Sequence, residues 1–115
     1  MEIQVDQIDN IIVVHLSGEL NQRTAPTLQE KLNPLINPDC KMLLEMGKLT
    51  YLSSAGLRIL LLLYRQIKNN QGFVALANLT EMVEDTMSIT GFLTFFTAYK
   101  TTDEGIIALR HNLPT

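Results

Sequence analysis

KMLLEMGKLTYLSSAGLRILLLLYRQIKNN, residues 41–70, contains the transition from a strand to a helix on which the fold depends. The first part, Lys41 to Met46, is mostly apolar and predicts a buried strand. Gly47 to Leu52 is expected to be a loop, and a helix is expected from about Ala55 to Asn70, where Asn69-Asn70-Gln71-Gly72 is a stop signal. The hydroxyl pair Ser53-Ser54 therefore lies at the boundary between loop and helix.

The hydroxyls of Ser53 and Ser54 lie next to the unpaired backbone N–H groups and the positive dipole end of the predicted helix. One of them caps the helix, a role worth about 1 kcal/mol. Phosphorylation there would add about −1.5 to −2 charges, and the helix N–H groups can donate hydrogen bonds to the new oxygens without disturbing the core. The pair is therefore predicted to be a helix cap that can also act as a switch.

The remaining elements follow from turn signals and from the spacing of apolar residues. Asp9-Asn10 predicts the turn of an opening hairpin, and Thr24 is expected to cap a helix with Pro26 in its first turn. The later elements are a strand at 73–77, a helix begun by Thr80 and ended by Gly91, a strand at 95–99, and a helix capped by Thr102-Asp103-Glu104. The order β-β-α-β-α-β-α-β-α predicts one α/β domain over residues 1–115, with a mixed sheet and about four helices packed on it.

The composition excludes several classes of partner. Hydrophobic residues make up 46% and charged residues 18% of the chain, which is ordinary for a compact domain. The net charge is −3 and the nine Lys and Arg residues are scattered, so no nucleic-acid partner is expected. The most apolar stretch, Leu57 to Tyr64, is too short for a membrane span, and no membrane association is expected. The single Cys40 and an N-terminus unlike a secretory signal predict a cytoplasmic location.

The residues around the serine pair disfavour enzyme chemistry. The nucleophile elbow of hydrolases has a glycine two residues before its serine, where this chain has Tyr51 or Leu52. His15 lies within a predicted strand and His111 near the C-terminus, so neither is placed to complete a triad. No zinc-ligand spacing and no Gly-x-x-x-x-Gly-Lys phosphate loop is present. We therefore expect no catalytic residue, no metal site and no cofactor.

Four segments of the chain carry a resemblance to a known family: Gly18–Asn21 followed by Thr24-Ala25, Leu43–Met46, Leu49–Arg58 and Ile89–Phe92. The chain resembles the bacterial anti-sigma factor antagonists of the STAS domain family along nearly its full length, and the third segment is the most specific. The resemblance implies a STAS fold and a partner-switching role in transcription regulation. In that family a serine at the helix start is phosphorylated by a serine kinase that is often the anti-sigma factor itself, and a PP2C-type phosphatase removes the phosphate. The unmodified form binds the kinase or anti-sigma partner, and the phosphorylated form releases it.

The resemblance also implies the site residues. The family's Asp-Ser-Ser/Thr-Gly-Leu stretch corresponds to 53–57 here, which places the phosphoacceptor at Ser54. The family's aspartate before the acceptor is Ser53 in this chain, so Ser53 is the alternative acceptor. The aspartate that often follows Gly-Glu-Leu is Asn21, and both departures remove negative charge near the site. The expected partner-binding residues are Asn21, Thr24, Ser53, Ser54, Ala55, Gly56 and Arg58.

Other features of the predicted site allow more than one interpretation. Gly56 lets the helix approach neighbouring backbone, or gives a modifying enzyme room to reach Ser54, and the two are compatible. Arg58 is expected to point to solvent, where it pairs with the phosphate, with an acidic partner residue, or with neither. The leucines from 57 to 63 surround the helix, which favours a helix wedged between the sheet and a neighbouring helix over an exposed patch. The loop at 19–24 is expected near Ser54 because both follow strand ends.

Two other functions are consistent with these residues. The first is a constitutive STAS scaffold or a nucleotide-sensing module that does not act on a sigma factor. The second is a small hydrolase that uses Ser54 as its nucleophile. The sequence favours the phosphorylation switch because it supplies a hydroxyl but no general base.

Overall fold

The computed structural model describes residues 1–111, which form five strands, four α-helices and two short 3-10 helices. The strands are β1 (Glu2–Ile8), β2 (Ile11–Leu20), β3 (Lys41–Leu52), β4 (Phe73–Ala77) and β5 (Ala98–Tyr99). The helices are α1 (Ala25–Leu32), α2 (Ser54–Asn69), α3 (Glu81–Ile89) and α4 (Thr102–Arg110), with 3-10 helices η1 (Asn33–Leu35) and η2 (Phe92–Phe95). The predicted order of strands and α-helices is confirmed.

The five strands form one mixed sheet in the order β1-β2-β3-β4-β5. β1 and β2 pair antiparallel as a hairpin, and the turn between them holds Asp9 at a φ of 57°. The other neighbouring strands are parallel, and each pair is joined by a crossover that contains a helix. The expected α/β class with a mixed sheet is therefore confirmed.

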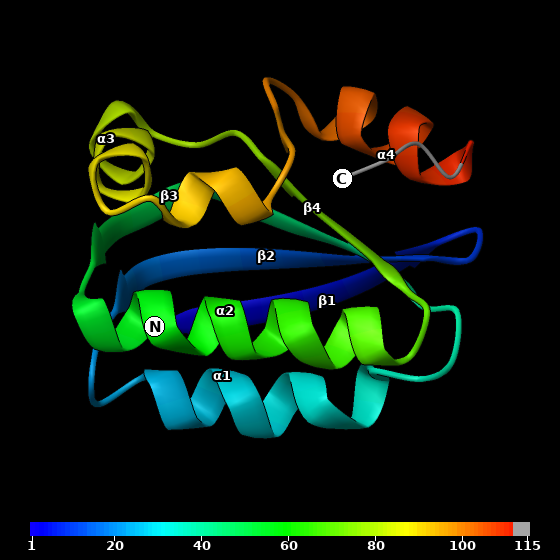
Figure 1. Ribbon diagram of the computed structural model, residues 1–115, viewed down its shortest axis with the longest axis horizontal. Helices are drawn as coiled ribbons and strands as arrows, with labels where there is room; N and C mark the ends of the chain where they lie inside the picture. The colour runs from blue at the N-terminus through cyan, green and yellow to red at the C-terminus, as the bar shows by residue number, and fades with distance from the viewer. Residues whose placement is uncertain (112–115) are drawn as a thin grey trace.

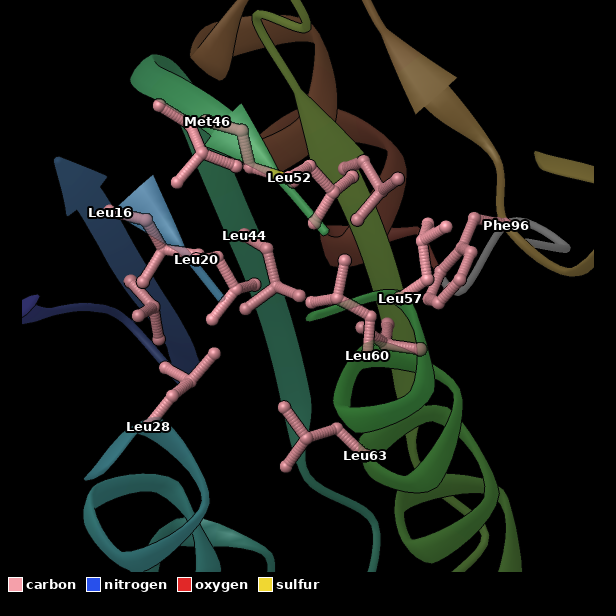
Figure 2. Close-up of a cluster of buried hydrophobic side chains, with 14 of the residues drawn as sticks. Leu16, Leu20, Leu28, Leu44, Met46, Leu52, Leu57, Leu60, Leu63 and Phe96 are labelled. Carbon is pink, nitrogen blue, oxygen red and sulfur yellow. The ribbon is translucent and has the colours of Figure 1, made fainter. Parts of the chain in front are cut away.

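Helices cover both faces of the sheet (Figure 1). α1 and α2 run side by side along one face, and α4 lies against the other. The larger core lies on the first face, and Figure 2 shows leucines of β2 and β3 directed toward Leu57, Leu60 and Leu63 of α2. The smaller core lies under α4, where Leu43 of β3 packs with Leu109. The start of α2 is therefore anchored by the larger core, whereas Ser54 and Arg58 on the opposite side of the helix are exposed.

The leucine-rich helix α2 is buried on one side and partly covered on its flanks. Leu57, Leu60, Leu63 and Ile67 are buried, whereas Leu62 keeps 37% of its surface exposed. α2 contacts α1, β4 and η2, so neighbours on several sides cover the apolar side chains. The predicted helix wedged between the sheet and a neighbouring helix is confirmed.

β3 is longer than the sequence predicts. Residues 47–52 do not form a loop but continue β3 and pair with β2 as far as Leu20 opposite Leu52. The register between the two strands shifts between His15 and Ser17 and again next to Gly18. These irregularities break the alternation of apolar and polar residues that marks a strand, which is why the pattern indicated a loop.

Two other element boundaries differ from the prediction, and the first helix ends in a 3-10 turn. The last strand contains only Ala98 and Tyr99, and the expected start at Phe95 belongs to η2. The cap of α4 is Thr101 rather than Thr102, because the Thr101 hydroxyl accepts the N–H of Glu104. The first helix ends at Leu32 and continues as a 3-10 turn that contains Pro34. A proline cannot donate to the helix ladder, so the change at this position is expected.

Candidate functional site

Ser53 is the N-cap residue of α2. Its hydroxyl oxygen accepts a hydrogen bond from the N–H of Gly56 at 3.2 Å, and its backbone is extended, with φ −90° and ψ 173°. Its own N–H donates to the carbonyl of Leu20 at 3.0 Å, which ties the start of α2 to the end of β2. Ser53 is half-buried and its hydroxyl oxygen caps α2, so its role in the fold is to stabilise the start of that helix.

Ser54 is the first residue of α2 and is exposed. Within residues 1–111 its hydroxyl makes no side-chain hydrogen bond, and the first turn of α2 contains no acidic residue. The N–H groups at this end of a helix have no partner within the helix, and the dipole there favours negative charge. A hydroxyl at this place can take up a charged group without displacing any part of the core.

Gly56 is buried and allows α2 to approach β2 closely. A Cβ atom at this position would lie 2.7 Å from the carbonyl oxygen of Leu20 and 2.9 Å from Cδ1 of Leu52. The space that Gly56 leaves is therefore filled by the protein interior. This geometry supports the interpretation of Gly56 as a packing residue, and its role in partner binding stays a prediction.

The loop that follows β2 lies beside the serine pair, as predicted, because Leu20 is paired with Leu52 and bonded to Ser53. Asn21 Oδ1 accepts the N–H groups of Arg23 and Thr24, at 2.9 and 3.2 Å. Thr24 Oγ1 accepts the N–H of Asn21 at 2.9 Å and donates to the carbonyl of Glu19 at 2.8 Å. These hydrogen bonds of the Asn21 and Thr24 side chains therefore stabilise the conformation of the loop.

The position of Thr24 corrects one detail of the prediction. Thr24 is the residue before α1, but its hydroxyl makes no capping hydrogen bond to that helix. The hydroxyl is used instead by the loop on its N-terminal side. Asn21 and Thr24 are both half-buried, so each presents part of its surface next to the start of α2.

The remaining predicted contacts lie along the first turns of α2. Ala55 is half-buried and Arg58 is exposed. The ion pairs formed among residues 1–111 involve His15 and Arg110, so Arg58 has no carboxylate within 4.0 Å in that part of the chain. Arg58 therefore points to solvent, as predicted, and brings a positive charge to the rim of the site.

A second polar cluster, which the sequence did not predict, joins three strands. His15 Nδ1 lies 3.0 Å from Glu45 Oε1, and His15 Nε2 lies 3.2 Å from Asp6 Oδ2. Glu45 Oε2 accepts the N–H of Gly47 at 2.7 Å and the side-chain amide of Asn78 at 3.3 Å. Burial disfavours the charged carboxylate, but the hydrogen bonds, led by the one to His15, outweigh burial and hold the pKa of Glu45 below its ordinary value.

Both histidines lie away from the serine pair. His15 is a sheet-face residue, as predicted, and it alternates with Val14 and Leu16, which face the core under α2. His15 therefore lies on the opposite face of the sheet from α2. His111 caps the C-terminal end of α4, which covers that same opposite face. Neither imidazole is therefore beside Ser54.

Among residues 1–111, no group of three or more His, Cys, Asp or Glu side chains is arranged to hold a metal ion. No helix in this range is both long enough and apolar enough to cross a membrane.

Comparison with known proteins gives consistent matches over nearly the full chain. Residues 2–105 match the family model described as STAS domain. BtrV of Bordetella bronchiseptica, whose name describes it provisionally as an anti-sigma factor antagonist, is 31% identical over 115 residues that cover 99% of each chain.

Solved structures show the same fold. The crystal structure of an anti-sigma factor antagonist from Mycobacterium paratuberculosis has a TM-score of 0.83 at 26% identity, covering 95% of this chain and 93% of that one. The structure of the Bacillus cell fate determinant SpoIIAA in the phosphorylated form has a TM-score of 0.72 at 18% identity, covering 95% of this chain and 100% of that one.

Proposed function

This chain belongs to the STAS domain family and to its anti-sigma factor antagonists, and from that membership we propose that it is a phosphorylation-controlled antagonist. Its unmodified form binds an anti-sigma factor that is also a serine kinase. Phosphorylation of Ser54 releases that partner, and a PP2C-type phosphatase restores the binding form. The protein acts as a binding module and not as an enzyme.

The observation that carries this proposal is the exposed hydroxyl of Ser54 at the first position of α2. Ser53 is the weaker acceptor because its oxygen is engaged by Gly56 as the helix cap. Ser54 has no such task, and the helix end beside it favours an anion. We therefore assign the modification to Ser54.

The modification is an ordinary phosphoryl transfer from ATP. Ser54 Oγ forms a bond to the γ-phosphorus while the bond between that phosphorus and the bridging oxygen of ATP breaks. The hydroxyl proton leaves to a base of the kinase, and ADP is the other product. Because ATP and sigma factors are found in the cytoplasm, we place the protein there.

Release of the partner follows from the change of charge. The proposed contact surface consists of the loop residues Asn21 and Thr24, which follow the strand end bonded to Ser53, and of Ala55 and the exposed Arg58 on the first turns of α2. A phosphate on Ser54 adds about −1.5 to −2 charges to that surface. Like charges forced together across an interface cost several kcal/mol, and each 1.4 kcal/mol is about a tenfold change in affinity. A single phosphate is therefore sufficient to separate the complex.

The proposal is tested by incubating the purified protein with ATP and each anti-sigma factor kinase of its source bacterium, then measuring intact mass and mapping the modified peptide. We expect one added phosphate at Ser54 and none in Ser54→Ala. Ser53→Ala is the matched control, because it removes the neighbouring hydroxyl and should still be labelled.

Three results would contradict the proposal. Labelling at Ser53 in place of Ser54 would show that Ser53 is the phosphoacceptor. A complete lack of labelling, with partner binding that survives Ser54→Asp, would favour the constitutive scaffold or a nucleotide-sensing module. Turnover of an activated ester that is lost in Ser54→Ala would favour the hydrolase.

A further inference from the structure

We infer that Arg58 is the intramolecular counter-ion of the phosphate on Ser54, so that phosphorylation withdraws an exposed positive charge from the contact surface as well as adding negative charge. The inference rests on the proposed function, since it requires Ser54 to be the phosphoacceptor. It also defines the partner, which must present an acidic group to Arg58 in the unmodified complex.

The spacing on α2 places the two residues on one face. Ser54 is the first residue of the helix and Arg58 is four residues later, and both are exposed. Side chains four residues apart are neighbours on a helix surface, with Cβ atoms about 5–6 Å apart. The anion precedes the cation along the helix, which is the favourable orientation for such a pair. A phosphate on Ser54 is therefore within reach of the Arg58 guanidinium.

Arg58 is also available for this role. Among residues 1–111 it has no carboxylate within 4.0 Å, whereas Arg110 pairs with Asp9 at 2.8 Å. The first turn of α2 contains no acidic residue that would compete for the guanidinium. The planar guanidinium can donate two parallel hydrogen bonds to phosphate oxygens, which makes arginine well suited to a phosphate.

The consequence for the partner is a reversal of charge. In the unmodified protein Arg58 is an exposed cation at the rim of the contact surface, and it pairs with no carboxylate of residues 1–111. After phosphorylation the phosphate and Arg58 together carry about −0.5 to −1 charge, and the guanidinium hydrogen bonds are occupied. An acidic group on the kinase that paired with Arg58 then loses its partner and meets an anion. Complementary charge across the interface therefore becomes repulsion.

The intramolecular pair is tested on protein made with phosphoserine at position 54, without any kinase. The second ionisation of the phosphate is followed by 31P NMR as a function of pH in the phosphorylated protein and in the same protein with Arg58→Gln or Arg65→Gln. Arg65 is the matched control because it is exposed on the same helix but lies eleven residues from Ser54. Circular dichroism confirms that each exposed variant is folded.

We expect the Arg58→Gln change to raise the pKa of the phosphate by about 0.3 units, since an adjacent cation favours the doubly charged form, and the Arg65→Gln change to leave it in place. An unchanged pKa in Arg58→Gln, or equal shifts in the two variants, would overturn the inference. Either result would leave the proposed function standing, because modification of Ser54 is measured separately.

The partner's charge is tested with the kinase that phosphorylates Ser54. Arg58→Glu in the unmodified protein should weaken binding at least about tenfold, and Arg65→Glu should not. If the Arg58→Glu variant bound the kinase as tightly as the unchanged protein, the inference that the partner presents an acidic group to Arg58 would be wrong.

Discussion

Ser53 and Ser54 are adjacent hydroxyls with separate tasks at the start of α2. The oxygen of Ser53 accepts the N–H of Gly56, whereas Ser54 is exposed on the first helical turn. The stability of the helix therefore depends on the first serine, and its charge can be changed at the second. This division lets the surface be modified while the fold is retained.

The division of tasks predicts different costs for the two alanine substitutions. Ser53→Ala should lower the free energy of unfolding by about 1 kcal/mol through loss of the cap. Ser54→Ala should change it by less than about 0.5 kcal/mol because the side chain is exposed and makes no hydrogen bond to another side chain of residues 1–111. Urea denaturation followed by circular dichroism measures both, with Ser53→Asp as a control that retains a capping oxygen. A cost for Ser54→Ala equal to that of Ser53→Ala would contradict this assignment.

Gly56 sets how closely α2 can approach β2. Gly56→Ala should destabilise the protein by about 1–3 kcal/mol, because the new methyl group meets the carbonyl oxygen of Leu20 at 2.7 Å. Gly105→Ala in α4 is the comparison, since its methyl group meets a terminal methyl of Leu43, which can move. Thermal unfolding should rank the first variant below the second, and the reverse order would show that the backbone of Leu20 yields easily.

Among the helices, α2 has the clearest difference between its buried and exposed sides. Leu60→Ala should cost about 2–5 kcal/mol, since Leu60 is fully buried in the larger core. Leu62→Ala, two residues later and 37% exposed, should cost less than half as much. Urea denaturation of the two variants tests this, and similar losses would mean that the outer side of α2 is covered in solution.

The elements that the sequence predicts well are those with unbroken local signals. The apolar run at 73–77 and the caps Ser53 and Thr80 mark their elements without help from the rest of the chain. Residues 47–52 were missed because the two register shifts between β2 and β3 hide the strand alternation. The last strand was placed too early because the aromatic residue Phe95 is typical of strands but lies here in η2.

The candidate site follows the same pattern. A hydroxyl pair at a helix start is a local signal, and it predicted that one of the two serines is the cap; the structure identifies the cap as Ser53 and shows Ser54 exposed. The loop closure by Asn21 and Thr24 was missed, because the hydroxyl of Thr24 had an equally plausible use as a helix cap. The cluster of His15 with Glu45 depends on pairing between residues far apart in the sequence, and that register is decided only by the folded sheet.

In the whole molecule, the serine pair and the His15 cluster lie on different faces of the sheet. The serine pair lies at the start of α2, above the larger core, and the His15 cluster lies on the face of α4. Glu45 joins β2 to β3 through His15 and reaches Asn78 after β4. This cluster therefore contributes to the stability of the sheet at a distance from the proposed switch.

The lowered pKa of Glu45 predicts a pH dependence of stability. A carboxyl whose pKa is lower in the folded than in the unfolded state stabilises fully above its unfolded pKa of about 4.3, and the effect is lost as the pH falls through the folded value. Glu45→Gln should therefore be about 1 kcal/mol less stable than the unchanged protein at pH 7, with a difference that shrinks below about pH 4.

Urea denaturation between pH 3 and pH 7 measures this dependence. Glu2→Gln is the control, because Glu2 is an exposed carboxylate on strand β1 of the same sheet. A difference between Glu45→Gln and the unchanged protein that stays constant with pH would show that the hydrogen bonds to Glu45 do not favour its charged form.

The central claim is that Ser54 can gain and lose charge without unfolding the protein, and that this charge decides whether the partner binds. The most direct test is isothermal titration of the kinase that labels Ser54 with the unmodified protein and with the Ser54-phosphorylated protein, alongside the thermal unfolding midpoint of each. We predict an affinity at least about 100-fold lower for the phosphorylated form, with a midpoint that is not lowered, because the helix end favours an anion. Equal affinities, or loss of the folded state on phosphorylation, would contradict the account.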